Sequence, residues 1–405
     1  MANPKPLPDA APDALQWRLL ALLAIGNLVI GSSAFVITGM IDAIARDLGV
    51  SAPAAGQAMT AYALATATLA PLAVMASGQW RRKNALLLAL LMFLLGNVVC
   101  ATAHSLTQLL IGRALLGAGS MFTPLAAGIA VAAVGPARRG QALSLVFLGI
   151  SLSYVTGVPL GAWIGLQHSW QTAVWLMAGA TLLMGLLVAW RVPARVNAPG
   201  ASFAGAAAVL RRGEVQTVLA TTLLYFGAIF VMFSYAGPVL TALVPMPAEQ
   251  LSLTLALFGL AGVVGTLLGG RLGDRLGALV ALRWMLPGLA LTMLLLPLTA
   301  GRFGWMLAVL LCWGVAGFAL MAPQQSRLAT LSPAQAPLLL SLNTSMLYFG
   351  MALGAAVGGA FVGTLGFARL PWVGAPLALA ALVLLWRGRA AAVAAAAASS
   401  PSAPR

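Results

Sequence analysis

Arg113 is the side chain with the clearest chemical consequence, because it stands inside the apolar run 109–118. A charge at bilayer depth costs at least ~2.5 kcal/mol, so such a residue almost always faces the interior of a helix bundle or a wet cavity. The alternative interpretation is a long side chain that reaches the outer headgroups and anchors its helix there. We predict that Arg113 faces the interior.

Proton-coupled chemistry needs a group that gains and loses a proton, and the sequence supplies few candidates. Asp42, at the outer end of the first predicted span, is the carboxylate placed for it, with Arg113 as its candidate partner. His104 and His168 lie at predicted loop edges, where a lone histidine is more often only interfacial, although it titrates near neutral pH. The proton carrier stays unassigned, because none of the seven acidic residues lies at a predicted span centre: Asp9, Asp13, Asp42, Asp47, Glu214, Glu249 and Asp274.

Groups for covalent or metal chemistry are not clustered. Cys100 and Cys312 stand in separate apolar segments, the two histidines are distant in sequence, and no carboxylates pair within the predicted spans. Enzymatic chemistry needs a clustered acid, base or metal site. We therefore predict neither an enzyme nor a metal or cofactor.

A second set of candidates consists of polar and amphipathic residues near the middles of predicted spans. Such groups are costly against lipid, so several should face a central cavity. Each could instead make a hydrogen bond between helices. The candidates for lining a substrate site are Asn27, Ser32 and Ser33 in the first span, Tyr154 in the fifth, Tyr225 in the seventh, Trp313 in the tenth and Tyr348 in the eleventh.

The elements that must position these residues are membrane helices. Of the 405 residues, 61% are hydrophobic and 7% are charged, whereas a soluble domain carries roughly 25% charged residues. The apolar runs have the length of a helical span, about 20 residues, and lack the alternation of an outer-membrane barrel. They predict an all-α integral membrane protein with twelve spans, over about 19–40, 54–76, 85–103, 106–134, 142–166, 170–190, 215–242, 251–272, 279–299, 303–323, 335–365 and 371–386.

The net charge of +15 is explained by the membrane and not by a nucleic acid. All but four of the 22 Lys and Arg residues fall on one side of the predicted topology. Arg46, Arg302 and Arg369 fall on the other side, and Arg113 lies inside a span. This asymmetry follows the positive-inside rule and predicts that both termini are cytoplasmic.

A change of composition after the sixth predicted span divides the chain. Residues 191–213 contain several Pro and Arg residues and no apolar run of the usual character, so they predict a cytoplasmic linker. Around it we predict a cytoplasmic tail over 1–17, six-helix bundles over 18–190 and 214–387, and a disordered cytoplasmic tail over the low-complexity residues 388–405.

The stretch between the eighth and ninth predicted spans combines a glycine stripe with an acid–base pair. Gly265, Gly269 and Gly273 recur every fourth residue, which predicts a smooth helix face that a neighbouring backbone can approach. A glycine after the pair tolerates the positive φ of a turn. The plainer interpretation is a helix-ending loop with charges at the headgroups. The motif reads G-x-x-x-D-R-x-G and consists of Gly270, Asp274, Arg275 and Gly277.

This pattern between two membrane helices resembles the cytoplasmic loop motif of the major facilitator superfamily, which has copies between helices 2 and 3 and between helices 8 and 9. After the second span, Arg81 and Arg82 keep the basic cluster, but Gly78 stands where the acid would be, so the first copy is degenerate. The resemblance implies two six-helix pseudo-repeats around a substrate site near the bilayer midplane. It also implies that Asp274 and Arg275 act as a cytoplasmic latch.

Two further motifs carry the resemblance. The sequence R-x-x-x-G at Arg113 is similar to the family's span-4 motif, whose arginine is linked to proton coupling. The fifth span resembles the motif of exporters that exchange substrate for protons, although Val158 stands where glycine is usual. Close packing of small residues is the alternative explanation. The residues of the span-5 motif are Gly149, Gly157, Pro159 and Gly161.

Stretches such as 37–40 and 235–238 are similar to the drug:proton antiporter branch, particularly its sugar- and arabinose-efflux-like members. The resemblance implies a monomeric protein of the bacterial plasma membrane that exports a small organic molecule (a drug, sugar or nucleoside-like compound) in exchange for protons. The sequence departs from the branch at Ala34, where an acidic residue is common. An uncoupled facilitator, an importer of a small polar solute and a membrane-embedded enzyme are the alternatives.

Overall fold

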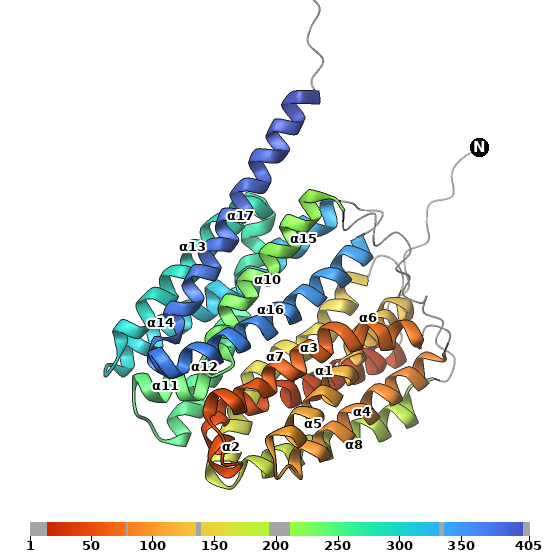
Figure 1. Ribbon diagram of the computed structural model, residues 1–405. Helices are drawn as coiled ribbons and strands as arrows, with labels where there is room; N and C mark the ends of the chain where they lie inside the picture. Colours follow the sequence, from red (N-terminus) through yellow and green to blue (C-terminus); the bar gives the residue numbers. More distant parts are fainter. Residues whose placement is uncertain (1–13, 78–79, 135–138, 194–210, 332–335, 400–405) are drawn as a thin grey trace, which may run out of the picture.

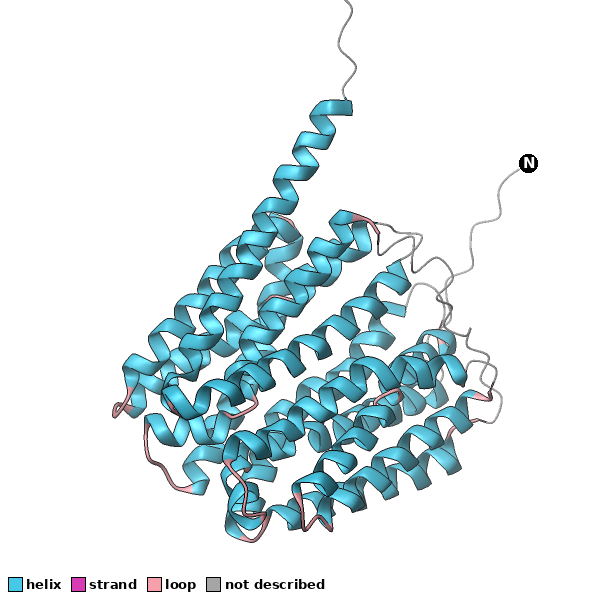
Figure 2. Cartoon of the chain, viewed as in Figure 1, coloured by secondary structure: helices cyan, strands magenta, loops and turns pink. Residues whose placement is uncertain are grey.

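The computed structural model describes residues 14–77, 80–134, 139–193, 211–331 and 336–399. Every regular element within these ranges is a helix, and Figure 2 shows the long helices running side by side. Twelve helical segments are long and apolar enough to cross a membrane. The predicted all-α fold with twelve spans is confirmed.

The first half of the chain supplies six of these spans. One of them is divided between two consecutive helices, α5 and α6. The helices are, in chain order, α1 (Ala14–Phe35), the short 3-10 helix η1 (Val36–Gly39), α2 (Ile41–Asp47), α3 (Ala52–Ala76), α4 (Arg82–Ala101), α5 (Leu106–Gly119), α6 (Phe122–Ala133), α7 (Arg139–Gln167) and α8 (Trp170–Arg191).

The second half supplies the other six spans and repeats this arrangement. Its divided span consists of α14 and α15. The helices are α10 (Gly213–Phe233), α11 (Ala236–Leu243), α12 (Ala248–Leu276), α13 (Ala278–Leu295), η3 (Leu296–Thr299), α14 (Phe303–Ala319), α15 (Met321–Leu331), α16 (Ala336–Leu365), η5 (Phe367–Arg369) and α17 (Leu370–Ser399).

Successive spans alternate in direction, so the bundle has two ends. We call the end at which α1 begins the terminal end. It also carries the joins between α3 and α4 and between α12 and α13. The opposite, distal end carries the short helices α2 and α11 and the joins between α7 and α8 and between α13 and α14.

The two halves use the same glycine-based packing. A Cβ on Gly149 of α7 would clash with the Ala24 carbonyl oxygen of α1. In the same way, a Cβ on Gly354 of α16 would clash with the Gly227 carbonyl oxygen of α10. Small residues of this kind let two helix backbones approach closely. The equivalence of the α1–α7 and α10–α16 pairs fits the predicted pseudo-repeat. The complete stripes are Gly149, Gly157, Gly161 and Gly165 in α7, and Gly350, Gly354 and Gly358 in α16.

Several predicted spans are not continuous α-helices. The first changes at Phe35 from α1 to η1, and the seventh breaks at Ser234 and Tyr235 between α10 and α11. The fourth breaks at Ser120 and Met121 between α5 and α6. Hydropathy counts apolar residues and does not register where the backbone changes direction, so the predicted spans do not locate these breaks.

The two halves meet along two helix pairs, α3 with α16 and α7 with α12. At the distal end, Gln167 of α7 hydrogen-bonds to Glu249 of α12. Nearer the middle of the spans, the rings of Tyr62 in α3 and Tyr348 in α16 lie 6.3 Å apart. From this level the halves diverge toward the terminal end (Figure 1). The terminal end of the second half is packed within itself, by an apolar cluster of Val215, Val218, Leu219, Leu328 and Leu339.

Parts of the predicted domain plan lie outside the described residues. These are residues 1–13 of the N-terminal tail, 194–210 of the linker and 400–405 of the C-terminal tail. The helix α17 continues to Ser399, so the structure is helical where the sequence predicts the start of a disordered tail. The repeated alanines there have the highest helix propensity of any residue.

Candidate substrate and coupling site

Arg113 lies in the interior of the first half. Its side chain is 1% exposed, and its guanidinium donates from Nε to the Ala58 carbonyl (3.3 Å), from Nη1 to Ser33 (3.3 Å) and from Nη2 to Ala34 (2.6 Å). The guanidinium carbon also lies 4.8 Å from the centre of the Tyr62 ring, within range of an attractive cation–π contact. The arginine therefore faces the bundle interior and not the headgroups.

The end of α1 explains why Arg113 is accepted there. An α-helix leaves its last four carbonyl groups without intrahelical partners and carries negative partial charge at that end. Because α1 ends at Phe35, the Ser33 and Ala34 carbonyls belong to this last turn. The sequence has no acidic residue between positions 48 and 213, and at Ala34, where the resembling branch commonly has an acid, the backbone carbonyl contacts the arginine instead.

A chain of hydroxyl groups connects the surroundings of Arg113 to the boundary between the halves. The Tyr62 hydroxyl lies 2.9 Å from the Ser120 Oγ, and Thr66 donates to the same Ser120 oxygen over 3.3 Å. Ser120 occupies the break between α5 and α6. On its other side, the Tyr62 ring meets Tyr348 of the second half edge-on. Tyr348, a predicted lining residue, therefore contacts the polar network of the opposite half.

The predicted lining residues of the first span stabilise their own half. Asn27 donates to a backbone carbonyl of α7 over 3.0 Å and accepts from Thr123 over 2.8 Å. The Ser33 hydroxyl donates to Asn97 Oδ1 over 2.8 Å, and Ser32 packs directly against a glycine of α7. These side chains make contacts between helices, which was the alternative that the sequence left open for them.

A similar buried network holds the second half together. Gln324 of α15 donates through Nε2 to the Val218 carbonyl (2.7 Å) and to Thr222 Oγ1 (2.9 Å), and Thr222 donates to Asn343 Oδ1 (2.7 Å). These bonds join α10, α15 and α16. The Gln324 Oε1 atom is buried without a partner in the described part of the chain.

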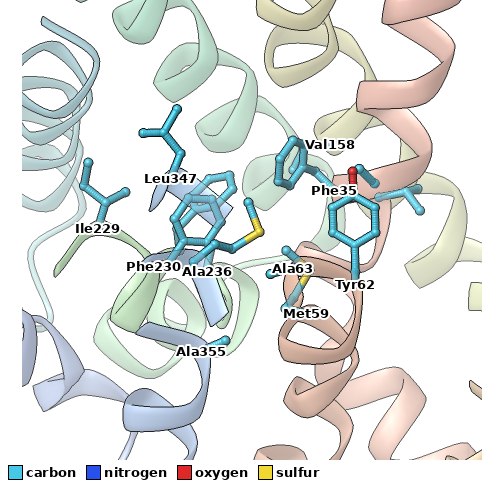
Figure 3. Packing of buried hydrophobic residues seen from close by; sticks show 14 of the residues in the cluster. Phe35, Met59, Tyr62, Ala63, Val158, Ile229, Phe230, Ala236, Leu347 and Ala355 are labelled. Atoms are coloured by element: carbon cyan, nitrogen blue, oxygen red, sulfur yellow. The ribbon is translucent and has the colours of Figure 1, made fainter. Parts of the chain in front are cut away.

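Aromatic rings from both halves meet in the middle of the bundle. Tyr154 of α7 stacks on Phe35 at 4.8 Å between ring centres, and lies 5.9 Å from Phe233 and 5.1 Å from Phe318 of the second half. Aromatic pairs at such distances contribute about 0.5–1.5 kcal/mol beyond the burial of their area. In Figure 3, Phe35 lies across from Phe230, and their ring centres are 6.3 Å apart. These contacts place Tyr154 at the boundary between the halves, and its role in lining a substrate site stays a prediction.

Two further predicted lining residues belong to the second half. Trp313 of α14 is 2% exposed and stacks on Phe258 at 5.0 Å, and Phe258 in turn contacts Phe233 and Phe318. The indole Nε1 of Trp313 is buried without a hydrogen-bond partner among the described residues. Tyr225 is 1% exposed and contacts the neighbouring Phe226. We call the set Phe35, Tyr154, Phe230, Phe233, Phe258, Trp313 and Phe318 the aromatic cluster.

The glycine stripe and acid–base motif lie on and after α12, far from the aromatic cluster along the helix. Gly265 and Gly269 pack against the backbone of α14. Gly277 has φ +83°, which supports the predicted turn, since this conformation suits glycine. The side chains of Asp274 and Arg275 are exposed at the terminal end, and Gly270 has no neighbour within 4 Å of where a Cβ would be.

In the degenerate copy of this motif, Arg81 is exposed and Arg82 is buried. Gly78 lies outside the described residues. The two copies therefore differ in structure as well as in sequence, because the basic side chains of the first copy are not equally accessible.

The span-5 motif packs α7 onto the first span and also bonds the two halves. Gly161 lies against Val36, in line with the other glycines of the α7 stripe. Pro159 lies within α7, and its carbonyl oxygen accepts a hydrogen bond of 2.8 Å from Ser252 of α12. This bond is one of the links that join the halves between the aromatic cluster and the distal end.

At the distal end, the backbones of the two halves touch. A Cβ on Gly237 of α11 would lie 2.6 Å from the carbonyl oxygen of Gly39 in η1. Tyr235 of the second half is fully buried, its hydroxyl donates to the Ala355 carbonyl over 3.0 Å, and its ring fills the space beside Gly56 of α3. These contacts close the distal end around small residues.

The acidic groups of α2 also lie at the distal end. Burial raises the pKa of the Asp42 carboxyl above its ordinary value, and the nearby Arg46 guanidinium lowers it by less. The Asp47 carboxylate accepts hydrogen bonds from Trp170 Nε1 (2.9 Å) and Gln171 Nε2 (2.6 Å) of α8. Asp42 does not hydrogen-bond to Arg113, whose partners are the carbonyls described above, so the structure does not bring this predicted pair into contact.

The architecture of two packed six-span halves agrees with a sequence comparison. A family model described as Major Facilitator Superfamily matches residues 23–336. The chain belongs to the major facilitator superfamily. The Escherichia coli (strain K12) protein named inner membrane transport protein YdhP is 32% identical over 376 residues, which cover 92% of this chain and 96% of the relative. The Bacillus subtilis (strain 168) protein named uncharacterized MFS-type transporter YbcL is 29% identical over 362 residues, which cover 89% of this chain and 92% of the relative.

Solved structures agree on the fold. The crystal structure of a D-xylose-proton symporter superposes with a TM-score of 0.76 at 16% identity, covering 91% of this chain and 97% of the symporter. The family and these relatives are transporters, and members of the superfamily bind small-molecule substrates. This superfamily member is therefore a multi-pass membrane transporter. Within the described ranges, no group of three or more His, Cys, Asp or Glu side chains is placed to hold a metal ion.

Sequence reasoning missed most of the aromatic cluster. Phe226, Phe230 and Phe233 recur at a spacing of four and three residues in α10, which places them on one helix face. That spacing could have predicted an aromatic face toward the other half. Asn97, Ser120 and Gln324 were also missed. Asn97 and Ser120 stand in apolar runs, and a polar residue there is the signal that would have found them. Gln324 is followed by Gln325, Ser326 and Arg327, so the sequence gives no such signal for it.

Proposed function

We propose that this protein is a secondary active transporter that exports a small organic molecule by alternating access, in exchange for protons, across the bacterial plasma membrane. The observation that carries the proposal is the contact pattern between the two pseudo-repeats. Their backbones and side chains meet from the distal end to the aromatic cluster, and the helices diverge beyond it. One state of a rocking cycle around a midplane site has this form.

The sidedness of the proposal comes from charge. The terminal end carries the exposed Arg271, Asp274 and Arg275 and the basic segments that the positive-inside rule assigns to the cytoplasm. With the terminal end in the cytoplasm, the arrangement is an inward-facing state in which substrate enters from the cell interior. Asp274 and Arg275 would then latch the terminal end in the opposite, outward-facing state.

Arg113 and Asp42 are the groups to which we assign coupling. Arg113 carries a buried charge held by backbone carbonyls, the Met59 sulfur and the Tyr62 ring, so a change of charge nearby alters its energy strongly in this low-dielectric setting. Asp42 has a raised pKa at the distal end, which suits a carboxyl that takes up a proton from the outer side. Tyr154, Trp313 and Tyr348 are the substrate-lining residues that we retain.

A specific observation keeps an uncoupled facilitator as the second candidate. Ala34 supplies Arg113 with a carbonyl oxygen and no carboxylate, so no buried acid is available beside the arginine to release a proton during the cycle. Transport would then follow the substrate gradient alone, in either direction. Neither candidate requires enzymatic chemistry, and a single chain contains the whole site, so we also propose that the protein works as a monomer.

Proton flux in inside-out membrane vesicles tests the proposal. The vesicles are energised to hold a pH gradient, which a pH-sensitive dye reports, and sugars, nucleosides and aromatic drugs are added in turn. A proton-coupled exporter dissipates the gradient with one class of compound, and vesicles with the Arg113→Ala variant do not. Movement of labelled compound without any proton flux would replace the antiporter by the facilitator. If no compound class produces either proton flux or movement of labelled compound, the proposed transport function is rejected.

A further inference from the structure

We propose that the aromatic cluster binds planar aromatic substrates that carry a hydrogen-bond acceptor and no positive charge, and that the Trp313 indole N–H donates to that acceptor. This inference rests on the proposed transport function and names the substrate class of the same central site. Three independent features support it: partly buried rings at the boundary between the halves, an unpartnered buried donor, and a fixed positive charge without a carboxylate.

The first feature is ring surface that the protein itself does not cover. Most rings of the cluster are buried, but Tyr154 and Phe318 are only partly buried, as is Tyr348 beside them. Tyr154 and Phe318 contact each other edge-on across the two halves at 5.1 Å. Tyr154 lies on the terminal side of the Pro159–Ser252 bond that joins the halves. A planar aromatic molecule can stack there or insert edge-on, in the geometries that aromatic pairs prefer.

The second feature is the Trp313 donor. A buried tryptophan N–H usually has a hydrogen-bond acceptor, and Trp313 is 2% exposed with Nε1 unpartnered among the described residues. Its ring stacks on Phe258, which contacts Phe318 at the uncovered surface. A carbonyl, carboxylate or ring nitrogen on a substrate that inserts between these rings supplies the missing acceptor.

The third feature is electrostatic. The Arg113 guanidinium bonds to the Ala34 carbonyl, one residue before Phe35 of the cluster, and stacks on Tyr62. The sequence has no acidic residue from position 48 to 213 or after position 274, and Glu214, Glu249 and Asp274 lie at the ends of their helices. Two unit charges ~10 Å apart in an effective dielectric constant of ~20 change a binding constant roughly tenfold. The site therefore repels cations and attracts anions.

Aromatic rings alone would favour cations, because a ring face attracts positive charge. Arg113 already lies over one face of Tyr62, and no carboxylate completes a cation site. The observations therefore favour uncharged and anionic aromatic compounds over aromatic cations. Comparing how tightly anionic, neutral and cationic forms of one ring system bind tests the proposal.

Binding to the purified full-length protein in nanodiscs provides the test, with one ring system in several charge forms. The probes are 2-naphthoate (anion), methyl 2-naphthoate (neutral), trimethyl-2-naphthylammonium (cation) and decahydro-2-naphthoate, which has the anion without the aromatic rings. Dissociation constants are measured by microscale thermophoresis, with empty nanodiscs as the blank. We expect the cation and the saturated anion each to bind at least tenfold more weakly than 2-naphthoate. Equal or tighter binding of either one overturns the proposal, as does absence of binding by all four.

The Trp313→Phe variant tests the donor, because it keeps an aromatic ring and removes the N–H. We expect about fivefold weaker binding of methyl 2-naphthoate, the loss typical of one hydrogen bond, and no change for unsubstituted naphthalene, which has no acceptor. Trp284→Phe is the matched control, since Trp284 is 75% exposed in the same half. An equal loss for both ligands would show that Trp313 only shapes the site.

Transport of the same probes into proteoliposomes separates this inference from the proposed function. If the charge preference appears in binding but no probe crosses the membrane, the aromatic site stands and the transport assignment fails. If a labelled sugar or nucleoside is transported while no naphthalene derivative binds, the transport assignment stands and this inference fails.

Discussion

Replacement of Gly237 by alanine should open the distal end of the protein. Its Cβ would lie 2.6 Å from the Gly39 carbonyl oxygen and 3.0 Å and 3.1 Å from the carbonyl carbon and Cα. These are backbone atoms of the other half, which cannot rotate away as a side chain can. The two segments must separate by about 0.8 Å to restore an ordinary contact of 3.4 Å. Overpacking of this kind costs about 1–3 kcal/mol.

The cost applies only while the distal end is closed, so it shifts the equilibrium between states. A difference of 1–3 kcal/mol corresponds to roughly a 5- to 150-fold change in the ratio of distally closed to distally open molecules. Gly363→Ala is the matched control, because Gly363 lies in the distal part of α16 and has no atom within 4 Å of the added Cβ.

Spin labels at His168 and Arg302, exposed at the distal end of the first and second half, report the separation by pulsed electron resonance. The exposed Cys312 is first replaced by Ser, whereas Cys100 is buried. We expect longer distances for Gly237→Ala and an unchanged distribution for the control. A correctly folded Gly237→Ala protein with the parental distances would refute the argument that the Gly39–Gly237 contact limits opening.

Three other variants test the remaining assignments. Asp274→Asn should lower the transport rate several-fold at unchanged expression, because it removes the charge of the latch; an unchanged rate in vesicles argues against a latch. Arg113→Lys should lower transport about tenfold or more, since one ammonium group cannot replace a guanidinium that donates to three carbonyls; parental transport would mean that the carbonyl contacts are dispensable. For Asp42, burial raises the pKa of the carboxyl in the folded state, so the folded protein binds this proton more readily than the unfolded chain does. The folded state is therefore stabilised by this group as the pH falls, and this stabilisation is lost as the pH rises through the folded pKa. Asp42→Asn should therefore raise the thermal midpoint at pH 7 and lose this advantage toward about pH 4, near the unfolded pKa; a midpoint difference that is the same at both pH values would contradict this.

The spans and one turn could be predicted because their causes are local. A run of apolar residues long enough to cross a bilayer has few other stable conformations, so the twelve spans follow from composition alone. Gly277 could be predicted as a turn residue because a charged pair precedes it and glycine accepts a positive φ. The broken first span could not, because the free carbonyl groups at the end of α1 accept hydrogen bonds from Arg113, which lies 79 and 80 residues further along the chain.

The direction of each polar side chain was only partly predictable. Arg113 had to face the interior, because the cost of a charge in lipid leaves few alternatives. Asn27 and Tyr154 carried similar signals in the sequence, yet Asn27 bonds to α7 within its own half and Tyr154 contacts the other half. The rotation of each helix about its axis decides between these outcomes, and it is set by packing between segments far apart in the chain.

The hydrogen bonds of α1 also determine the order in which this protein can be assembled during synthesis. The Asn27 side chain donates to Val146, 119 residues later in the chain. At 5–20 residues per second, the ribosome needs roughly 6–24 s to make that partner. During this interval the Asn27 amide is in the membrane without its α7 partner, and the free carbonyls at the end of α1 wait for Arg113, which follows 79 and 80 residues after Ala34 and Ser33. The insertion machinery, a neighbouring lipid headgroup or a chaperone must shelter them, so the biogenesis of the first half should depend on translation speed between α1 and α7.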